Sequence, residues 1–283
     1  MPPLISLIVA TLGRSAEMER FLEHADKQSY CKFEVIVVVD QNSDGRLEDL
    51  IKRYESRMAI IQLRCSPGLS KARNAGIRVS GGEIIAFPDD DCWYPPSLLE
   101  SIVTLFEKNT NWDGLTGRIV NEMNSVSGDA RFDTESGYVT LPNLWRRVCS
   151  ATIFFTRETV EAIGNFDEEL GPGAGTPWGG ADDIDYLARA IKAGRTIFYD
   201  PKICVFHPDL SVAAQADRLG RAYSYGAGMG RVWMKQKFPA RVIGCYLLRP
   251  LVGVCVSLVT GRWMQARYRW AAFQGRLSGL MSR

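Results

Sequence analysis

The stretch Ile84-Ile85-Ala86-Phe87-Pro88-Asp89-Asp90-Asp91-Cys92-Trp93-Tyr94 begins with an apolar run, which is followed by three consecutive aspartates. Its uncharged part has the composition of a short buried strand. Three adjacent carboxylates repel one another, and a hard divalent cation bound at the carboxyl end of the strand would relieve that repulsion. Oxygen ligands suit Mg²⁺ or Mn²⁺, which often share a substrate's phosphates. A solvated acidic turn is the simpler interpretation of the aspartates alone, and a metal site for a diphosphate is the alternative.

Further apolar runs upstream alternate with segments of helical spacing and indicate an α/β fold. Leu4–Ala10 is a predicted strand, and Glu34–Val39 is so uniformly apolar that we expect it to be buried on both faces of a parallel sheet. A short strand at Ile60–Leu63 and a helix at Leu69–Val79 precede the strand that ends in the aspartates. This order predicts a mostly parallel, Rossmann-like sheet flanked by helices, with ligands beyond the carboxyl ends of the strands.

The polar residues at these strand ends favour a binding site over a chance turn. Thr11, Asp40 and Asp89–Asp91 each follow a different predicted strand, so they should converge on one crevice. The first strand is not followed by G-x-G-x-x-G, and the chain has no G-x-x-x-x-G-K-[ST], which excludes a dinucleotide fingerprint and a P-loop. We therefore expect phosphate to be held by a metal at the aspartates.

Charge is distributed unevenly along the 283 residues, although the net charge is only +2. Residues 211–283 contain 12 Lys or Arg and one acid, whereas residues 1–210 contain 22 basic and 31 acidic residues. The seven cysteines form no C-x-x-C pair, so neither a disulfide framework nor a zinc site is indicated, and a reducing cytoplasm is expected. The start Met1-Pro2-Pro3-Leu4 lacks the basic region of a signal peptide.

Four blocks, in order and spacing, resemble the nucleotide-sugar half of family 2 glycosyltransferases, which have the GT-A fold. They are Leu7–Thr11, Val37–Gly45, Gly68–Ile77 and Gly82–Asp91. The resemblance implies that Thr11 and Asp40 line the pocket for base and ribose and that Arg73 lies near the base. It also implies that Asp89 and Asp91 are the two acids of a D-x-D motif, with Asp90 between them among the donor-binding residues, and that Mn²⁺ or Mg²⁺ is the cofactor.

A second acidic stretch, Asp182-Asp183-Ile184-Asp185-Tyr186, opens a predicted helix that Gly194 would end. Acids at a helix start are common caps, which explains one or two of the three without catalysis. The stretch also resembles the family motif E-D-x-D-L-x-x-R-x-x-x-x-G, with Asp182 in place of Glu and Tyr186 in place of Leu. The resemblance implies that Asp183 is the catalytic base, with Asp182 beside it. Asp185 and Arg189, four residues apart, predict a structural ion pair.

Two further residues have a structural and a functional interpretation. Trp178, in the Gly-rich loop 171–180, either offers an aromatic face to an acceptor sugar or is tucked into the core. His207 follows the predicted strand Ile203–Phe206. It is either a third metal ligand, which would suit Mn²⁺ better than Mg²⁺, or a hydrogen-bonded structural residue.

We expect a GT-A catalytic domain at residues 1–210, in which 1–94 hold the nucleotide sugar and 95–210 the acceptor. Residues 121–143 are a candidate mobile loop. Residues 211–283 form a basic, amphipathic helical extension, with two helices broken at Pro250 that lie on an anionic membrane surface. The extension could instead pack on the catalytic domain or on a second subunit, giving a homodimer. A spanning helix is disfavoured by Arg249, and nucleic acid is not an expected partner.

These features predict a glycosyltransferase that moves a sugar, with inversion, from a nucleoside-diphosphate sugar to a hydroxyl of a sugar or lipid-linked sugar acceptor. The setting would be bacterial-type polysaccharide, glycolipid or surface-glycan synthesis at the cytoplasmic face of the cell membrane. One alternative is a sugar-phosphate nucleotidyltransferase, for which the loop Thr11–Arg14 is short. Another is an inactive nucleotide-sugar-binding or scaffolding protein, against which the acids at 89, 91 and 183 argue.

Overall fold

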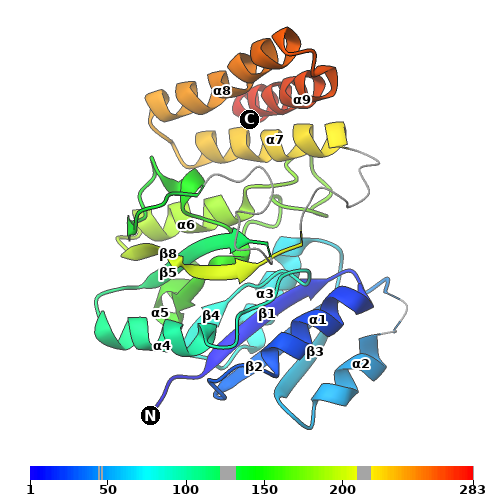
Figure 1. Ribbon diagram of the computed structural model, residues 1–283, viewed down its shortest axis with the longest axis vertical. Coiled ribbons are helices and arrows are strands. Elements are labelled where there is room, and N and C mark those ends of the chain that lie inside the picture. The colour runs from blue at the N-terminus through cyan, green and yellow to red at the C-terminus, as the bar shows by residue number, and fades with distance from the viewer. Residues whose placement is uncertain (44, 46, 122–131, 209–217, 283) are drawn as a thin grey trace. The chain divides into compact units, whose positions relative to one another are not determined.

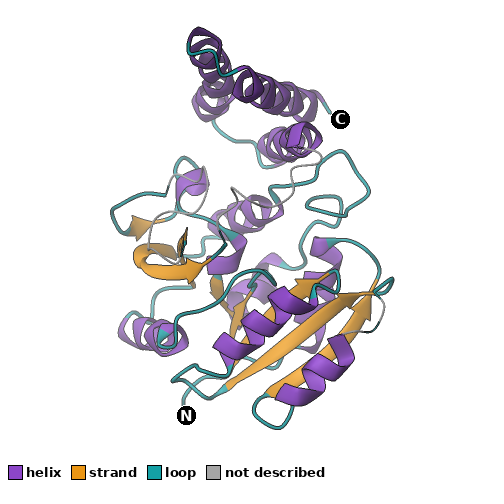
Figure 2. Ribbon diagram, turned by 45° about the vertical axis from the view of Figure 1, so that its right-hand side comes forward, coloured by secondary structure: helices purple, strands orange, loops and turns teal. Residues whose placement is uncertain are grey.

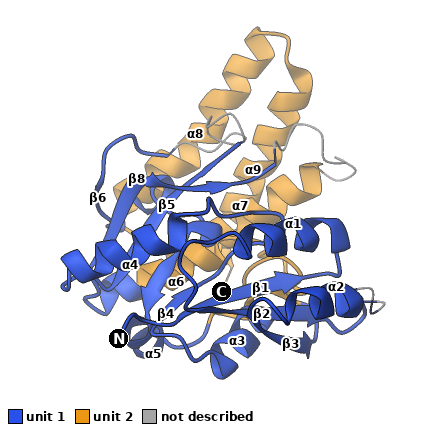
Figure 3. Cartoon of the chain, turned by 60° about the horizontal axis from the view of Figure 1, so that its bottom comes forward, with its two compact units in different colours: residues 1–67, 71–165, 190–212 blue, residues 68–70, 166–189, 213–283 orange. Residues whose placement is uncertain are grey.

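The computed structural model describes residues 1–43, 45, 47–121, 132–208 and 218–282 (Figure 1). The chain divides into two compact units (Figure 3). Unit 1 comprises residues 1–67, 71–165 and 190–212, and unit 2 comprises residues 68–70, 166–189 and 213–283. The compact units thus group 166–189 with the C-terminal helices, while the functional boundary at residue 210 stays a prediction.

Unit 1 contains an eight-stranded sheet with the order β3-β2-β1-β4-β7-β5-β8-β6. Strands are orange in Figure 2. The pairs β1–β2, β2–β3, β1–β4 and β5–β8 are parallel, whereas β7 is antiparallel to both β4 and β5, and β6 is antiparallel to β8. This mixed, mostly parallel sheet confirms the predicted fold class. The strands are β1 Ile5–Thr11, β2 Phe33–Asp40, β3 Ala59–Cys65, β4 Ile84–Ala86, β5 Gly114–Val120, β6 Gly137–Tyr138, β7 Phe154–Thr156 and β8 Ile197–Phe206.

The main core of unit 1 forms where alternate strand residues meet the helices. Ile5, Leu7 and Val9 of β1 point to one face of the sheet, because side chains alternate along a strand, and they join one buried cluster with Val35, Val37 and Val39 of β2. Residues of α1, α2 and α4 complete this cluster. The helices of the first 163 residues are α1 Ser15–Ala25, α2 Leu47–Tyr54, α3 Leu69–Val79, α4 Leu98–Lys108 and α5 Arg157–Ile163, with short 3-10 helices at Leu144–Arg146 and Ser150–Thr152.

The sheet brings the predicted polar residues to one edge. Strand β1 ends at Thr11 and β2 ends at Asp40, and the two strands pair in parallel register. An isolated parallel bridge between Ala10 and Asp89 continues the pairing of β1 with the chain after β4. The carboxyl ends of three neighbouring strands therefore carry Thr11, Asp40 and the aspartate triplet, as in other open α/β sheets that bind ligands at this edge.

Unit 2 is built mainly from helices, and its longest three pack through glycines. They are α7 Arg218–Lys235, α8 Ala240–Val259 and α9 Trp263–Met281, and α9 contacts both of the others. Gly226 and Gly230 of α7 face α9, and Gly275 and Gly279 of α9 face α7. A Cβ added to Gly279 would clash with the carbonyl of Ala227. Because the two backbones touch, only glycine fits at these positions.

The predicted break at Pro250 is wrong, because α8 runs without interruption from Ala240 to Val259. A proline inside a helix leaves the carbonyl four residues earlier without its usual donor. Here that carbonyl belongs to Tyr246, and Arg276 of α9 donates a hydrogen bond to it. Burial lowers the pKa of Arg276 to about 10, so the guanidinium stays charged at neutral pH.

A 3-10 helix at Ser150–Thr152 precedes the short strand β7, and helix α4 begins at Leu98, soon after Pro95 and Pro96. Residues 122–131 of the predicted mobile loop lie outside the described residues, and 137–138 form β6.

We predict that Gly279→Ala lowers the melting temperature of the protein, because overpacking typically costs about 1–3 kcal/mol. Gly244→Ala is the matched control, since nothing lies within 4 Å of an added Cβ at this position of α8. That change should be neutral or stabilise by up to about 1 kcal/mol, as alanine favours helix over glycine. Thermal unfolding of the two variants beside the unaltered chain checks this, and a Gly279→Ala variant that melts no lower would contradict the glycine packing.

Candidate active site

Asp89, the first aspartate of the triplet, is held by an ion pair. Its Oδ1 lies 3.1 Å from Nη2 of Arg73, whose side chain is only 1% exposed on α3. The Ser150 hydroxyl donates to the same carboxylate, 3.2 Å from Oδ2. The sequence predicted Arg73 near the nucleotide base, and the structure places it against Asp89. The base contact stays a prediction.

Asp90 is buried and receives the guanidinium of Arg14. Both Nε and Nη2 of Arg14 donate to this carboxylate, while Nη1 donates to Asp91 Oδ2 at 3.1 Å. Burial acts to lower the pKa of Arg14, but the two carboxylates outweigh it and raise that pKa. Arg14 is a partner of the aspartates that was not predicted from the sequence. Its position three residues beyond the end of β1, at the same edge of the sheet, was the available signal.

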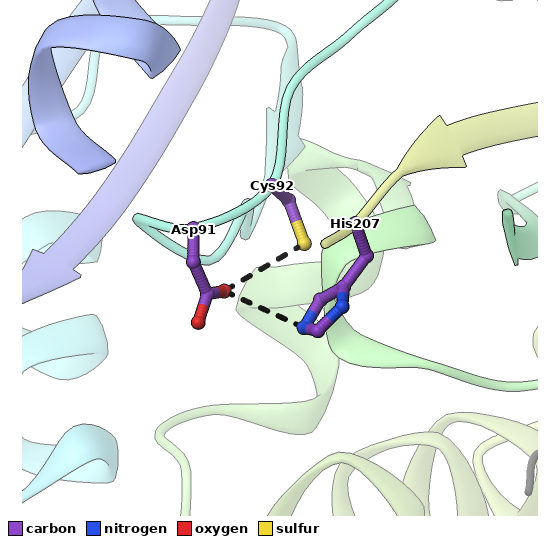
Figure 4. A group of neighbouring side chains, drawn as sticks. All are labelled: Asp91, Cys92 and His207. Atoms are coloured by element: carbon purple, nitrogen blue, oxygen red, sulfur yellow. Dashed lines mark hydrogen bonds and ion pairs between the residues drawn. The ribbon is translucent and has the colours of Figure 1, made fainter. Parts of the chain in front are cut away.

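Asp91 and His207 point toward each other from two different segments (Figure 4). Nε2 of His207 lies 3.7 Å from Oδ1 of Asp91, and Nδ1 lies 2.6 Å from the Pro208 carbonyl oxygen. A carbonyl only accepts hydrogen bonds, so this contact assigns the proton of a neutral ring to Nδ1. In this tautomer Nε2 is the acceptor nitrogen of the ring and lies on the Asp91 side, as in many metal-binding histidines.

The Cys92 thiol belongs to the same group but is a poor ligand for a hard cation. Ligand atoms of Asp91, Cys92 and His207 all lie within 4.8 Å of one another. Burial, reinforced by the carboxylates of Asp89 and Asp91, raises the pKa of the Cys92 thiol well above its usual range. The carboxylate and the imidazole fit Mn²⁺ well and Mg²⁺ less well. Among the described residues, this group does not include Asp89, the other predicted ligand.

Thr11 and Asp40, the other predicted donor-binding residues, shape the loops after their strands. The Thr11 hydroxyl accepts a hydrogen bond from the Gly13 amide at 3.2 Å and also bonds Asp90. Oδ1 of Asp40 accepts from the Asn42 amide at 2.8 Å, which forms a turn. Both residues stand at the predicted edge, and their contacts with a nucleotide stay predictions.

Asp182 and Asp183 open helix α6, Asp182–Lys192, whose first eight residues belong to unit 2. Asp182 is buried, and an added Cβ at Gly171 would lie 3.0 Å from its carboxylate. Asp183 is half-buried, and its Oδ1 accepts from the Ile184 amide at 2.8 Å. The residue before the helix, Ala181, has a φ of 67°, which is unusual for a residue other than glycine.

The predicted ion pair of Asp185 and Arg189 is present, with 3.0 Å between Oδ2 and Nε. Asp185 is completely buried and has two further partners on α7 or just beyond it, Lys235 and Gln236, which the sequence analysis missed. Trp178 is partly exposed, and the guanidinium of Arg231 lies 4.3 Å from its ring centre. One face of the indole is therefore covered, and stacking of a sugar on the other face stays a prediction.

Comparison with known proteins agrees with this architecture. Glycosyltransferase AglE of Haloferax volcanii is 26% identical over 259 residues, which are 89% of this chain and 81% of AglE. The Escherichia coli enzyme WfgD, named as a UDP-Glc:alpha-D-GlcNAc-diphosphoundecaprenol beta-1,3-glucosyltransferase, is 26% identical over 44% of this chain and 49% of its own.

Solved structures of two glycosyltransferases share the fold. The mannosyltransferase PcManGT of Pyrobaculum calidifontis, solved with GDP-Man and Mn²⁺, matches 98% of this chain and 88% of its own with a TM-score of 0.66 and 18% identity. S. aureus TarS 1–349, solved with UDP-GlcNAc, matches 96% of this chain and 92% of its own with a TM-score of 0.60 and 18% identity. These likenesses identify the fold as GT-A.

The family model of glycosyl transferase family 2 matches residues 6–163, from the first strand to the end of α5. This span includes the aspartate triplet and its partners Arg14, Arg73 and Ser150. It covers more than half of the 283 residues, and the chain therefore belongs to glycosyl transferase family 2.

Proposed function

We propose that this protein transfers a sugar from a nucleoside-diphosphate sugar to a hydroxyl of a sugar or lipid-linked sugar acceptor, with inversion at the anomeric carbon. The observation that carries the proposal is the approach of His207 to Asp91, the last aspartate of the triplet, at the edge of the sheet where the strand ends gather. The nucleotide sugars in the titles of the PcManGT and TarS structures support it. Neither the nucleotidyltransferase nor the scaffolding alternative has comparable support.

A divalent cation, proposed to be Mn²⁺ or Mg²⁺, would be held by Asp91 and His207, with Asp89 retained as a further ligand from the family pattern. Such a bound cation would supply Lewis acidity to the departing diphosphate. Arg14 and Arg73 add positive charge beside the same carboxylates. Together they would offset the repulsion between the aspartates and the phosphates of the donor.

Asp183 is proposed to accept the proton of the acceptor hydroxyl. As this hydroxyl oxygen loses its proton, it attacks the anomeric carbon. The bond from that carbon to the diphosphate breaks, and the nucleoside diphosphate leaves with the electron pair. One displacement of this kind inverts the configuration. Asp182, buried beside Asp183 on the first turn of α6, would fix the position of that turn.

We also propose that α8 and the turn into α9 contact an anionic membrane surface. Of the described helices, α8 is the one long and apolar enough to cross a membrane, and 17% of its apolar window is buried. Leu248, Val252, Val256 and Val259 are exposed at helical spacing, and Trp263 and Met264 extend the apolar surface past the turn.

The charge of this region favours a peripheral contact with anionic lipid. Residues 218–283 include no Asp or Glu and twelve Lys or Arg. Arg249 stands exposed near the middle of α8, where spanning would cost about 2.5–3.5 kcal/mol. Apolar residues among arginines are typical of helices in a lipid interface. The diphosphoundecaprenol in the name of WfgD is consistent with a lipid-linked acceptor at the inner face of the cell membrane.

Asp91→Asn is predicted to weaken Mn²⁺-dependent binding of nucleoside diphosphates about tenfold or more, because a neutral amide binds a hard cation poorly. Thermal-shift titration with UDP, GDP, dTDP, CDP and ADP, with and without Mn²⁺, measures this, since ligand at a hundred times its dissociation constant stabilises by about 2.7 kcal/mol. Asp26→Asn, in an exposed pair with Arg57, is the control. An Asp91→Asn variant with unaltered Mn²⁺ dependence would remove Asp91 from the metal site.

Asp183→Asn should reduce transfer by about 10²–10⁴-fold, the typical contribution of a general base. Donor binding should stay within about twofold, because the base is needed only when the acceptor attacks. Initial rates with acceptor and the dissociation constant of the donor are measured on the same preparation. If the variant transfers sugar at the original rate, the base is a different residue.

Val256→Glu is predicted to release the protein from vesicles that contain anionic lipid, because it places a charge on the exposed face of α8. Val79→Glu is a matched control, since Val79 is also an exposed valine on a helix. It lies on α3, which is far from α8 in the sequence. Co-sedimentation at low salt with anionic and with purely zwitterionic vesicles gives the comparison. The membrane proposal fails if the unaltered protein stays in the supernatant with anionic vesicles. A dimer that Val256→Glu dissociates would point instead to a second copy on this face.

A further inference from the structure

Helix α7 presents one continuous face to the segment that leads into α6. Ser224, Gly228, Arg231 and Lys235 are spaced by four, three and four residues, which places them on one side of a helix. Each of them contacts a residue between 167 and 185. The opposite glycines, Gly226 and Gly230, face α9. The side of α7 next to the α6 segment is therefore occupied from Ser224 to Lys235.

The first half of this face holds the chain just before Asp182. The Ser224 hydroxyl accepts from the Gly179 amide at 3.0 Å and donates to the Pro177 carbonyl at 3.2 Å. Gly228 lies directly under Gly180, so that an added Cβ would clash with the Gly180 carbonyl. These contacts fix the backbone of residues 177–180 against the helix.

The second half holds the first turn of α6 through a buried carboxylate. Asp185 is fully buried, and Lys235 Nζ and Gln236 Nε2 lie 3.0 and 2.8 Å from its Oδ1. Lys235 also pairs with Asp167 at 2.7 Å, so one cation joins two parts of unit 2. Burial acts to raise the pKa of Asp167, but Lys235 and the Glu169 amide outweigh it and lower that pKa. Asp167 therefore remains an ionised partner of Lys235 at neutral pH.

Ala181 lies between these two anchored points. Its φ of 67° is unfavourable for a residue with a Cβ. Such a conformation persists only where the surrounding contacts impose it. Here Gly180 is fixed on one side and Asp185 on the other, and the direction in which Asp182 and Asp183 leave the backbone follows from this forced turn.

We propose that Lys235 and Gln236 are positioning residues for catalysis, which act through Asp185 to hold the Asp183 carboxylate in the orientation needed for proton transfer. This inference rests on the proposed function, in which Asp183 is the base. It assigns to α7 a part in the reaction, although the family model ends at residue 163. The donor-binding residues belong to unit 1, so donor affinity should not depend on these contacts.

Lys235→Met tests the proposal, because it keeps the aliphatic stem and removes the charge. We expect the turnover number for transfer to fall about 10–100-fold while the dissociation constant of the donor stays within about twofold, the signature of an interaction needed in the transition state. Lys235→Arg keeps the positive charge and should recover at least a third of the transfer rate that Lys235→Met loses. Gln236→Met, of similar size to the original residue, should lose about 3–10-fold. Lys237→Met, an exposed lysine two residues from Lys235, is the control and should retain full activity.

Melting temperatures separate positioning from simple stability. Rates are measured at least 15 °C below the melting temperature of every variant, where a purely structural role would leave the turnover number unchanged. If Lys235→Met folds and transfers sugar at the original rate, the positioning role is wrong while the proposed function stands. If Lys235→Met does not fold, Gln236→Met decides by the same comparison. Transfer that persists in Asp183→Asn contradicts both the proposed function and this inference.

Discussion

Burial of aspartates beside protein cations is the constraint on which both groups of acids depend. Asp90 and Asp185 are 3% and 0% exposed. An unpaired buried carboxylate costs several kcal/mol, and loss of one partner from a buried pair typically costs about 3–5 kcal/mol. Arg14 meets this requirement for Asp90, and Arg189 with Lys235 meets it for Asp185. Each group thus contains an anchored aspartate next to a more exposed one, Asp91 in the first and Asp183 in the second.

The backbone provides these anchors by two different means. In unit 1 the parallel register of β1, β2 and β4 brings the strand ends to one edge, so Arg14 reaches the triplet from the loop after β1. In unit 2 close helix packing takes the place of a sheet. The glycines of α7 and α9 let the two backbones touch, and α7 in turn supports the chain before α6. A rigid support of this kind suits a residue whose proton transfer depends on its orientation.

Much of the first group could be predicted because its signals are local. Uniformly apolar strands such as Glu34–Val39 and abrupt polar ends at Asp40 and Asp89 identify both the sheet and the edge at which these strand ends gather. The pair of Asp185 and Arg189 follows from four-residue spacing in one helix. The contacts that sequence reasoning missed join residues far apart in the chain. Arg14 and Asp90 are 76 residues apart, and Asp185 and Gln236 are 51 apart. The continuity of α8 through Pro250 likewise depends on Arg276 of the next helix.

The proposed metal site consists of Asp91 and His207, which together would bind the cation that carries the donor diphosphate. Pulsed electron paramagnetic resonance of Mn²⁺ with the protein and a nucleoside diphosphate tests it most directly, since it reports the nuclei bonded to or near the metal. A site of this composition should give hyperfine coupling to phosphorus and to one histidine nitrogen in the same complex, with the nitrogen coupling lost in His207→Gln. A Mn²⁺–diphosphate complex on the protein without nitrogen coupling, or with coupling that survives in His207→Gln, would contradict it.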